Sequence, residues 1–447
     1  MARSRILVVA YDFPPHGAIG TLRTLRVVRQ LSARGWDVTV LTSDPAHFRP
    51  STPNEPALLA QVPAGVTVLR AGPIRLRRGK PREATSSSKP ATAGSPAPPP
   101  APAGALKQIK SVLDAALSIP DREVGWLLPA FWTGLRHRFR TGAFDVVYSS
   151  APPWTGQLVA YGLKLALRRP WVADFRDPWG RAPWRGDRFR FAVRASGLLE
   201  RLVVNRTDRI VFVAEGNRDD FAAQYGPRVA AKFHLVSNGC DPAEIDALER
   251  PVLPPDAPHV MLHAGSLYAG RTPVPIFKAL SQALDQGRLD RSRFKLRFLG
   301  ASLIATDLAQ ACRELRIDDV VEFLPRVPRQ EGLKAMLSAS SLLLLQPGHT
   351  VSVPGKVYEY LAVGRPIFAL AEGESADVVR RSGIGVSVEA YDDVPAIMEG
   401  LLRVVDMSRS AVPAPPREMY DGNLGAAVIE QILRQAAAQP AAAQSPA

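Results

Sequence analysis

Short, continuous apolar runs alternate along this chain with longer segments whose apolar residues recur at helical spacing. The runs are rich in Val, Ile and Leu and lack the strict apolar–polar alternation of a half-exposed strand, so they predict parallel strands buried on both faces. The segments between them, such as 273–286 and 330–340, predict helices. The predicted strands are 5–11, 37–43, 66–72, 145–151, 171–176, 209–215 and 233–238 in the first half of the chain, and 260–265, 294–300, 320–325, 342–347, 366–371 and 385–390 in the second half.

This alternation predicts an α/β protein with two doubly wound, Rossmann-like domains in series. A chain of 447 residues is too long for one ordinary core and suits two domains. The proline-containing stretch 249–259 has no periodic pattern and is interpreted as the linker between them. We therefore expect a first domain at 1–248 and a second domain at 260–410.

Three other segments stand outside this alternation. Residues 79–106 are dominated by Pro, Ala, Ser and Gly, which predicts a disordered insertion within the first domain. The tail 438–447 has a similar composition and the same prediction. Within the region 411–437, residues 422–435 carry an apolar stripe at helical spacing, and we expect this helix to cross back onto the first domain.

Composition narrows the class of protein. An apolar fraction of 46% and a charged fraction of 22% are typical of a soluble globular protein. The formal net charge of +14 indicates an anionic partner, which leaves nucleic acid, acidic lipid and phosphorylated small molecules open. Two cysteines, Cys240 and Cys312, are too few for a disulfide framework or a zinc knuckle. The first apolar run is cut short by Asp12, and no run approaches the roughly 20 apolar residues that span a bilayer, so we expect a cytoplasmic protein.

Ligands of open parallel sheets bind outside the carboxyl ends of the strands. The loop after the first strand contains Gly17, Gly20 and Arg23 and leads into a helix, whose N-terminus favours an anion. Its spacing does not match the dinucleotide fingerprint, and a plain glycine-rich turn is the alternative. The loop after the first strand of the second domain carries Ser266 and Arg271, which suit phosphate oxygens.

The stretch 352–370 places a cation at the start of a helix. Lys356 falls in the first helical turn, where a cation is unfavourable unless an anion is bound nearby. Glu359, one turn later, is an acceptor suited to ribose hydroxyls; a surface ion pair between the two residues is the alternative interpretation. His259 and His263 do not predict a metal site, because on a strand their side chains would lie roughly 13 Å apart.

The stretch 172–179 gathers Asp174, Arg176 and Asp177 at the carboxyl end of another strand. Carboxylates in this position suit acid–base chemistry or the binding of hydroxyl groups. A structural Asp–Arg pair explains the same residues equally well, and both interpretations stay open.

Taken together, the stretches 13–20, 236–242, 265–271 and 355–367 resemble, in order and spacing, the retaining, nucleotide-sugar-dependent glycosyltransferases of family 4, which have the GT-B fold. The resemblance covers nearly all of both expected domains. It implies two Rossmann-like domains facing a central cleft, with the nucleotide-sugar in the second domain and most of the acceptor site in the first.

The resemblance also assigns roles to single residues. Glu359 matches the second glutamate of the family's E-x7-E signature, which holds the nucleotide ribose. Arg271 matches the arginine that meets the diphosphate, and Lys356 adds a second cation there. Gly17 matches the first glycine of the amino-terminal loop that approaches the donor, whereas Ala18 replaces the second glycine.

Two further departures affect the sugar and the acceptor. Val351 stands where the signature has its first glutamate, so we expect His349, Thr350 or Ser352 to contact the donor sugar instead. The family's acceptor-side histidine is not evident, and Asp174 or Asp177 occupies that neighbourhood.

The resemblance implies a hexosyltransferase-type reaction that moves a sugar from a nucleoside diphosphate to an acceptor hydroxyl with retention, without a metal and without a cofactor other than the donor substrate. The acceptor class stays open between a glycan, a lipid-linked molecule and a small molecule. Two alternatives of other kinds also stay open: a non-catalytic nucleic-acid- or carbohydrate-binding protein on a degenerate GT-B scaffold, and a GT-B epimerase.

The basic excess suggests one more partner. Residues 124–140 mix aromatic side chains with arginines in the manner of an interfacial helix, so peripheral docking on an anionic membrane at its inner face is one interpretation and packing in the core is the other. Nucleic acid is not expected, because the arginines are scattered over many helices. The aromatic residues of this segment are Trp126, Phe131, Trp132 and Phe139, and its arginines are Arg136, Arg138 and Arg140.

Overall fold

Two parallel β-sheets organise the chain. The computed structural model describes residues 3–48, 52, 54–74, 112–180, 189–254, 256–268, 270–348, 350–410 and 412–438. The first sheet has seven strands in the order β3-β2-β1-β4-β5-β6-β7, and the second has six in the order β10-β9-β8-β11-β12-β13. Every predicted strand is confirmed, with ends that differ by a few residues at most. The strands are β1 (Arg5–Ala10), β2 (Asp37–Ser43), β3 (Thr67–Ala71), β4 (Val146–Ala151), β5 (Trp171–Phe175), β6 (Arg209–Phe212), β7 (Phe233–Leu235), β8 (His259–Ala264), β9 (Phe294–Leu299), β10 (Val321–Leu324), β11 (Ser341–Gln346), β12 (Ile367–Ala371) and β13 (Gly385–Val388).

Helices cover both faces of the first sheet, because its strands are apolar on both sides. Ile6 and Val8 of β1 pack towards one layer, which contains the C-terminal helix, whereas Leu7 and Val9 pack towards the opposite layer. The helices of this domain are α1 (Ile19–Ala33), α3 (Leu127–Thr141), α4 (Thr155–Leu167), α5 (Arg190–Arg206), α6 (Glu215–Tyr225), α7 (Pro227–Ala230) and α8 (Pro242–Asp246), with short 3₁₀ turns η1 (Pro45–His47), η2 (Pro56–Gln61) and η3 (Val124–Trp126).

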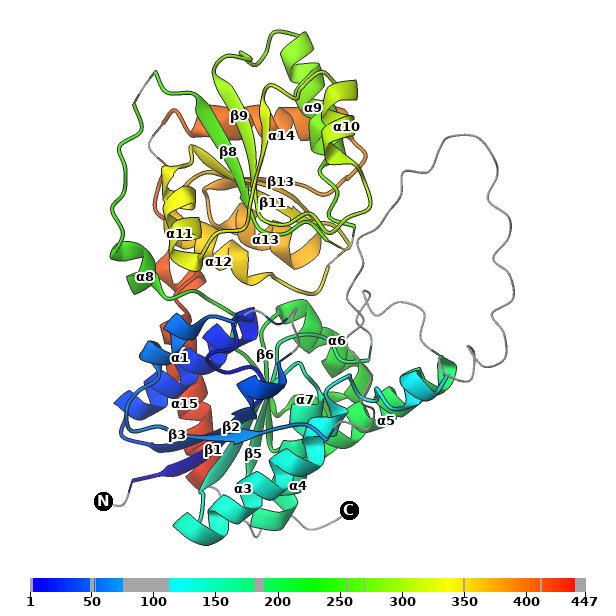
Figure 1. Cartoon of the computed structure of the whole chain (residues 1–447), viewed down its shortest axis with the longest axis vertical. Coiled ribbons are helices and arrows are strands. Elements are labelled where there is room, and N and C mark those ends of the chain that lie inside the picture. Colours follow the sequence, from blue (N-terminus) through cyan, green and yellow to red (C-terminus); the bar gives the residue numbers. More distant parts are fainter. Residues whose placement is uncertain are drawn as a thin grey trace.

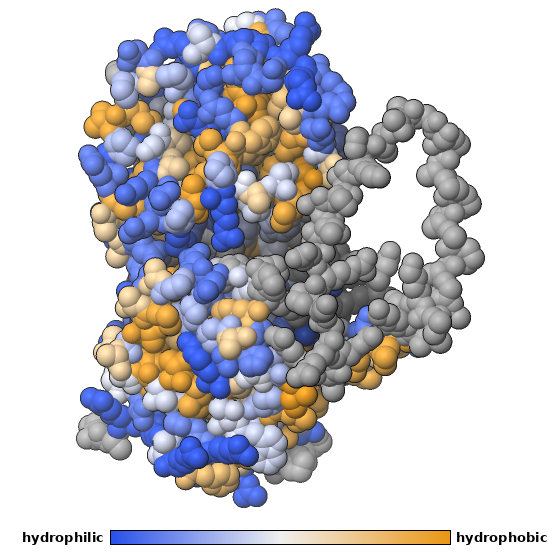
Figure 2. All heavy atoms as spheres, in the orientation of Figure 1, coloured by the Kyte–Doolittle hydropathy of each residue, from blue (hydrophilic) through white to orange (hydrophobic). Residues whose placement is uncertain are grey.

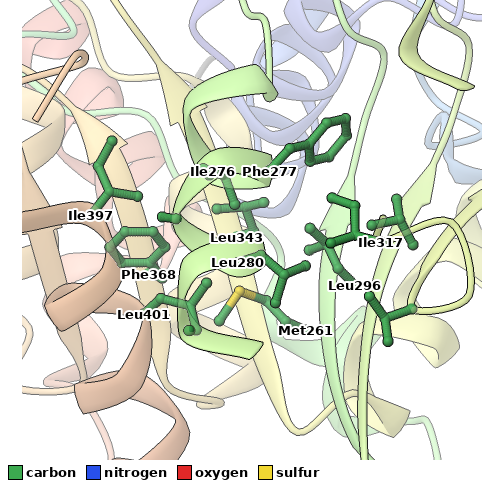
Figure 3. Close-up of a cluster of buried hydrophobic side chains, with 14 of the residues drawn as sticks. Met261, Ile276, Phe277, Leu280, Leu296, Ile317, Leu343, Phe368, Ile397 and Leu401 are labelled. Carbon is green, nitrogen blue, oxygen red and sulfur yellow. The ribbon is translucent and has the colours of Figure 1, made fainter. Parts of the chain in front are cut away.

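The second domain repeats this architecture. Met261, Leu343 and Phe368 of its sheet pack against Ile276, Leu280 and Leu401 from helices on one face, as Figure 3 shows. Leu262 and Leu344 point to the other face, towards a separate layer of helices. The helices are α9 (Val274–Asp285), α10 (Leu308–Glu314), α11 (Arg329–Ser338), α12 (Gly355–Val363), α13 (Gly373–Arg381) and α14 (Val394–Met407), followed by η4 (Arg417–Met419) and α15 (Gly422–Ala438).

Helix α15 returns to the first domain, as the sequence predicts. It packs beside α1 and against β4, β5 and β6, and the red ribbon of α15 lies within the lower domain of Figure 1. Trp36 donates a hydrogen bond from Nε1 to Glu430 at 3.0 Å, which ties the end of α1 to α15. Where the chain leaves the first domain and where it returns, two segments lie side by side: Cys240 N donates to Tyr420 O and Gly422 N donates to Cys240 O, both at 2.8 Å.

The predicted insertion at 79–106 and the tail beyond Ala438 lie outside the described residues. None of the helices in the described part of the chain is both long and apolar enough to span a bilayer. The two domains stand one above the other in Figure 1, and α8 lies beside the junction between them.

Candidate functional site

A cavity of about 420 Å³ lies between the two domains. Its walls come from the carboxyl ends of β1 and β8 and from the N-termini of α11 and α12, as expected for a ligand site of two facing parallel sheets. The charged and polar residues among its lining are Arg26, Glu55 and Asn238 from the first domain and His263, Ser266, Tyr268, Arg271, Arg326, Arg329, Lys356 and Glu359 from the second.

Arg271 enters this cavity with its guanidinium held from two sides. The ring of Tyr268 lies 4.3 Å from Cζ of Arg271, and Nη2 of Arg271 donates to Gln346 Oε1 at the end of β11. Its Nε is buried without a hydrogen-bond partner in the described part of the chain. Burial lowers the pKa of Arg271 from its ordinary value, and an arginine remains charged under such a shift. The side chain is therefore a preorganised cation with an unused donor.

Lys356 is the second cation of the cavity. It is the second residue of α12, so its ammonium lies at the positive end of the helix dipole. Among the described residues the amine has no hydrogen-bond or ion-pair partner. Burial lowers the pKa of Lys356, an effect that Glu359 partly offsets. A buried ammonium at a helix N-terminus without a partner is costly unless an anion binds there.

His263, at the end of β8, contributes a third unused polar atom. Its Nδ1 lies 3.0 Å from the carbonyl oxygen of Leu343, which only a protonated Nδ1 can satisfy. The other ring nitrogen, Nε2, is therefore an acceptor, and it is buried without a partner among the described residues. Burial lowers the pKa of His263 to about 4, so the ring is neutral at pH 7.

Glu359 is an ionised carboxylate on the wall of the same cavity. It accepts a hydrogen bond from Nη1 of Arg329 through Oε1. Burial alone would raise the pKa of Glu359, but Arg329 and Lys356 hold that pKa below its ordinary value. The structure thus brings together Ser266, Arg271, Lys356 and Glu359, four of the residues of the second domain that the resemblance and the loop positions single out.

The glycine loop of the first domain faces these residues. Gly17 and Ala18 line the cavity, and a β-carbon on Gly17 would stand 2.9 Å from Cγ of Glu55. Gly20 does not line the cavity; the guanidinium of Arg176 occupies the place where a β-carbon on Gly20 would stand, so the close contact there is with Arg176 and not with a ligand. The loop therefore reaches the site through Gly17 and not through Gly20.

The structure does not bring Asp174 or Arg23 to the cavity. Asp174 is fully buried and accepts hydrogen bonds from Nε and Nη2 of Arg23 at 2.8 and 2.9 Å. Tyr148 and Ser150 donate to the same carboxylate. Arg23 also donates to the carbonyl oxygen of Val236. This geometry corresponds to the structural Asp–Arg pair that the sequence left open, although the partner is Arg23 and not the adjacent Arg176.

The remaining predicted residues of the described part of the chain do not line the cavity. Asp177 follows β5 with a partly buried carboxyl whose pKa is raised by burial, and it has no ion-pair partner among the described residues. The carbonyl oxygens of Thr350 and Ser352 accept hydrogen bonds from Glu374 N and Ser375 Oγ of α13. Val351 packs near Gly216 of α6 across the domain junction. His349 lies outside the described residues.

Among the described residues no cluster of His, Cys, Asp or Glu side chains is arranged to hold a metal ion. The sequence interpretation missed three residues that contact predicted site residues: Tyr268 in a loop, Gln346 at the end of β11 and Arg329 at the start of α11. Tyr268 had a detectable signal, since it lies in the glycine loop three residues before Arg271. Gln346 and Arg329 had none.

Two facing Rossmann-like domains with a C-terminal helix that crosses back define the GT-B fold. The family model described as Glycosyltransferase Family 4 matches residues 92–244, and the model described as Glycosyl transferases group 1 matches residues 258–407. The two matches together span about two thirds of the chain. The chain belongs to the family 4-like glycosyltransferases, and it is a sugar-transferring enzyme.

Solved structures share the fold at low sequence identity. Sucrose-phosphate synthase from Thermosynechococcus elongatus matches with a TM-score of 0.58 and 15% identity over 97% of both chains. Anabaena HepE in complex with UDP and glucose matches with a TM-score of 0.58 and 12% identity over 97% of this chain and 98% of that chain. A UDP-N-acetylglucosamine 2-epimerase described as putative, from Listeria monocytogenes, matches with a TM-score of 0.55 and 9% identity over 97% and 96%. A comparison of the sequence with curated proteins gives no match.

Proposed function

We propose that this enzyme transfers a sugar from a nucleoside-diphosphate-sugar to an acceptor hydroxyl, with retention at the anomeric carbon and without a bound metal. The observation that carries the proposal is the convergence of Arg271, Lys356 and Glu359 on one cavity, with a buried, unpaired Nε on Arg271 and an ammonium on Lys356 that has no partner among the described residues. Unpaired buried donors are rare in folded proteins and indicate a polar ligand.

The chemistry assigned to these residues follows from charge. When the glycosidic bond to the diphosphate breaks, negative charge grows on the leaving group, and Arg271, Lys356 and the N-terminus of α12 stabilise it. Glu359 accepts hydrogen bonds from the ribose. Retention rests on the family resemblance: the acceptor hydroxyl attacks from the face that the diphosphate leaves, and no protein nucleophile is required.

The nature of the donor has indirect support. HepE, which shares the fold, is described in complex with UDP and glucose, which supports a nucleotide-sugar as the donor. An epimerase is the second candidate, because a protein described as a UDP-N-acetylglucosamine 2-epimerase shares the fold as well. An epimerase needs no acceptor, which separates the two reactions in an assay.

The decisive experiment measures release of nucleoside diphosphate from a panel of UDP-, GDP- and ADP-sugars, with and without hydroxyl acceptors. Transfer predicts release that depends on the acceptor, and Glu359→Ala should abolish it. Arg291→Gln serves as the matched control, since Arg291 forms an exposed ion pair with Asp319 in the same domain, away from the cavity. Conversion of the sugar-nucleotide in the absence of an acceptor would show that the reaction is epimerisation and not transfer.

We further propose that the acceptor is lipid-linked and that the first domain meets an anionic membrane through the outer faces of α3, α4 and α5. Of the segment 124–140, Trp126 is fully buried and Phe131 packs against the core, as the core interpretation expected. Leu128, Trp132 and Phe139 are exposed, with exposed fractions of 55%, 54% and 78%, which supports the interfacial interpretation.

Charge on these helices complements acidic lipid. No Asp or Glu is exposed between residues 124 and 206 in the part of the chain that the structure describes, so the exposed charged side chains of the outer faces are basic. Part of this surface is visible as orange and blue atoms at the lower right of Figure 2. Apolar side chains beside arginines suit the interface of an anionic bilayer. The exposed apolar residues of α4 and α5 are Leu165, Phe191, Val193 and Leu198, and the exposed arginines are Arg136, Arg140, Arg168, Arg190, Arg194, Arg201 and Arg206.

A further inference from the structure

Arg329, the first residue of α11, forms a fork between two carboxylates. Its Nη1 donates to Glu359 Oε1, while its Nε and Nη2 donate to Glu244 Oε2 at 3.1 and 2.8 Å. Glu244 lies in α8, at the junction between the domains, and its Oε1 accepts a hydrogen bond of 3.3 Å from Gln61 of the first domain. A continuous chain of contacts therefore leads from the first domain to Glu359.

The contact with Arg329 determines which carboxylate oxygen of Glu359 is available to a ligand. Arg329 occupies Oε1, and Oε2 has no partner among the described residues. A carboxylate with one oxygen held and the other exposed to the cavity has a fixed orientation, which lowers the entropy lost when a ribose hydroxyl binds. The fork also keeps the carboxyl ionised against the effect of burial.

The position of Arg329 is unfavourable for the helix that carries it. A cation at the first residue of α11 opposes the helix dipole, and the side chain is largely buried. Two carboxylates compensate this cost, and the planar guanidinium can reach both at once, which a lysine ammonium cannot do with the same geometry. A residue that only linked α8, α11 and α12 would not need to be charged, so a purely structural role does not explain an arginine at position 329.

We propose that Arg329 is a positioning residue of the donor site: anchored by Glu244, it orients Glu359 and keeps it ionised for the nucleotide ribose. The inference rests on the proposed role of Glu359. It adds a residue that contacts neither the diphosphate nor the sugar and yet sets the affinity for the nucleotide.

The test measures equilibrium binding of UDP, GDP and ADP to the full chain by calorimetry, and then uses the tightest-binding of the three. Arg329→Gln should weaken binding about tenfold at pH 7.5, as expected for the loss of a charge-assisted hydrogen bond. The variant loses the Arg329 charge and hydrogen bond that lower the pKa of Glu359, and only Lys356 and Arg26 then oppose the effect of burial. Binding by this variant should therefore weaken further as the pH falls from 7.5 to 5.5, whereas binding by the wild type should change little.

Two more variants separate charge from geometry. Arg329→Lys keeps the cation, so its binding should be weaker than that of the wild type but equally insensitive to pH. Glu244→Gln should shift affinity in the same direction as Arg329→Gln by a smaller factor, and Arg291→Gln should change nothing. Thermal unfolding of each variant checks that the fold persists, and Arg329→Lys stands in if Arg329→Gln does not fold.

The outcomes distinguish this inference from the proposed function. If Glu359→Ala binds the nucleotide as tightly as the wild type, the ribose assignment fails. If Glu359→Ala weakens binding but Arg329→Gln or Arg329→Lys leaves both the affinity and its pH profile unchanged, Arg329 is only a structural tie and the inference is overturned.

Discussion

The side chain of Lys356 passes directly over Gly265, the first residue after β8. A β-carbon placed on Gly265 would stand 2.7 Å from Cε of Lys356 and 3.6 Å from Nε2 of His263. The absence of a side chain at Gly265 thus creates the channel in which the ammonium reaches the cavity. This contact brings the two glycine-containing stretches of the second domain together at the proposed anion site.

Gly265→Ala should therefore displace Lys356 and lower kcat by roughly 10- to 100-fold, in the range seen when one preorganised charge is misplaced. The backbone of Gly265 lies outside the left-handed region, so alanine is compatible with its conformation. Steady-state kinetics with the best donor measures the effect, and circular dichroism monitors the fold. An unchanged kcat would mean that the ammonium of Lys356 reaches its position even when residue 265 has a side chain.

Lys356→Met should lower the activity of the enzyme and raise the stability of the free protein. Removing a buried ammonium that has no partner eliminates a desolvation cost, so the melting temperature of the free protein should rise by a few degrees. Turnover should fall by about 100-fold or more, because one of two cations on the leaving diphosphate is lost. Scanning calorimetry and nucleotide-release assays on the same sample test both parts. A lower melting temperature would show that the amine has a stabilising partner.

Stability should fall on acidification through His263, which is buried, and His259, which is partly buried. Burial lowers the pKa of both His259 and His263 to about 4. Between pH 6.5 and pH 4 the unfolded chain binds protons that the folded protein excludes, so the free energy of unfolding decreases as the pH falls through this window. Each histidine should contribute a loss of roughly 2 kcal/mol at pH 5 relative to pH 7.5.

Chemical denaturation at pH 7.5, 6 and 5 measures this dependence. His263→Gln should flatten it by about the share of one histidine, because an amide does not titrate in this range. Val252→Gln provides the control, because Val252 is 92% exposed and carries no ionisable group. Equal slopes for wild type and His263→Gln would contradict a neutral, buried ring at position 263.

The fold could be predicted from apolar runs alone because parallel strands buried on both faces leave an unmistakable pattern. Arg271 and Lys356 could be predicted as neighbours for a related reason: both follow strands of one parallel sheet, and the carboxyl ends of such strands meet at one edge. Periodicity and loop position were sufficient for both results.

Contacts between distant residues could not be predicted in this way. Arg329 lies 85 residues from Glu244, and Arg23 lies 151 residues from Asp174. No spacing rule links them, so the sequence suggested an ion pair at 174–177 but not its partner, and it gave Arg329 no role. His263 was considered only as a metal ligand, because the direction in which a strand's last side chain turns depends on the loops packed against it.

The exposed face of α3 provides the last prediction. Trp132→Ala combined with Phe139→Ala should reduce binding to vesicles that contain about 30% phosphatidylserine or phosphatidylglycerol by tenfold or more, because each side chain buries apolar area at the interface. Binding of the wild type should also weaken as salt is raised, since the surrounding arginines act through screened charges. Soluble acceptors, if accepted at all, should be turned over by the variant as by the wild type, because the two residues lie outside the cavity.

Co-sedimentation with vesicles measures binding, and vesicles of pure phosphatidylcholine show how much of it depends on charge. Phe323→Ala is the matched control, because Phe323 is an exposed aromatic residue of the second domain, 42% exposed, and lies outside this surface. Equal sedimentation of the double variant and the wild type would exclude α3 as the membrane contact. If binding persists on neutral vesicles and at high salt, the apolar residues contribute to membrane binding and the arginines do not.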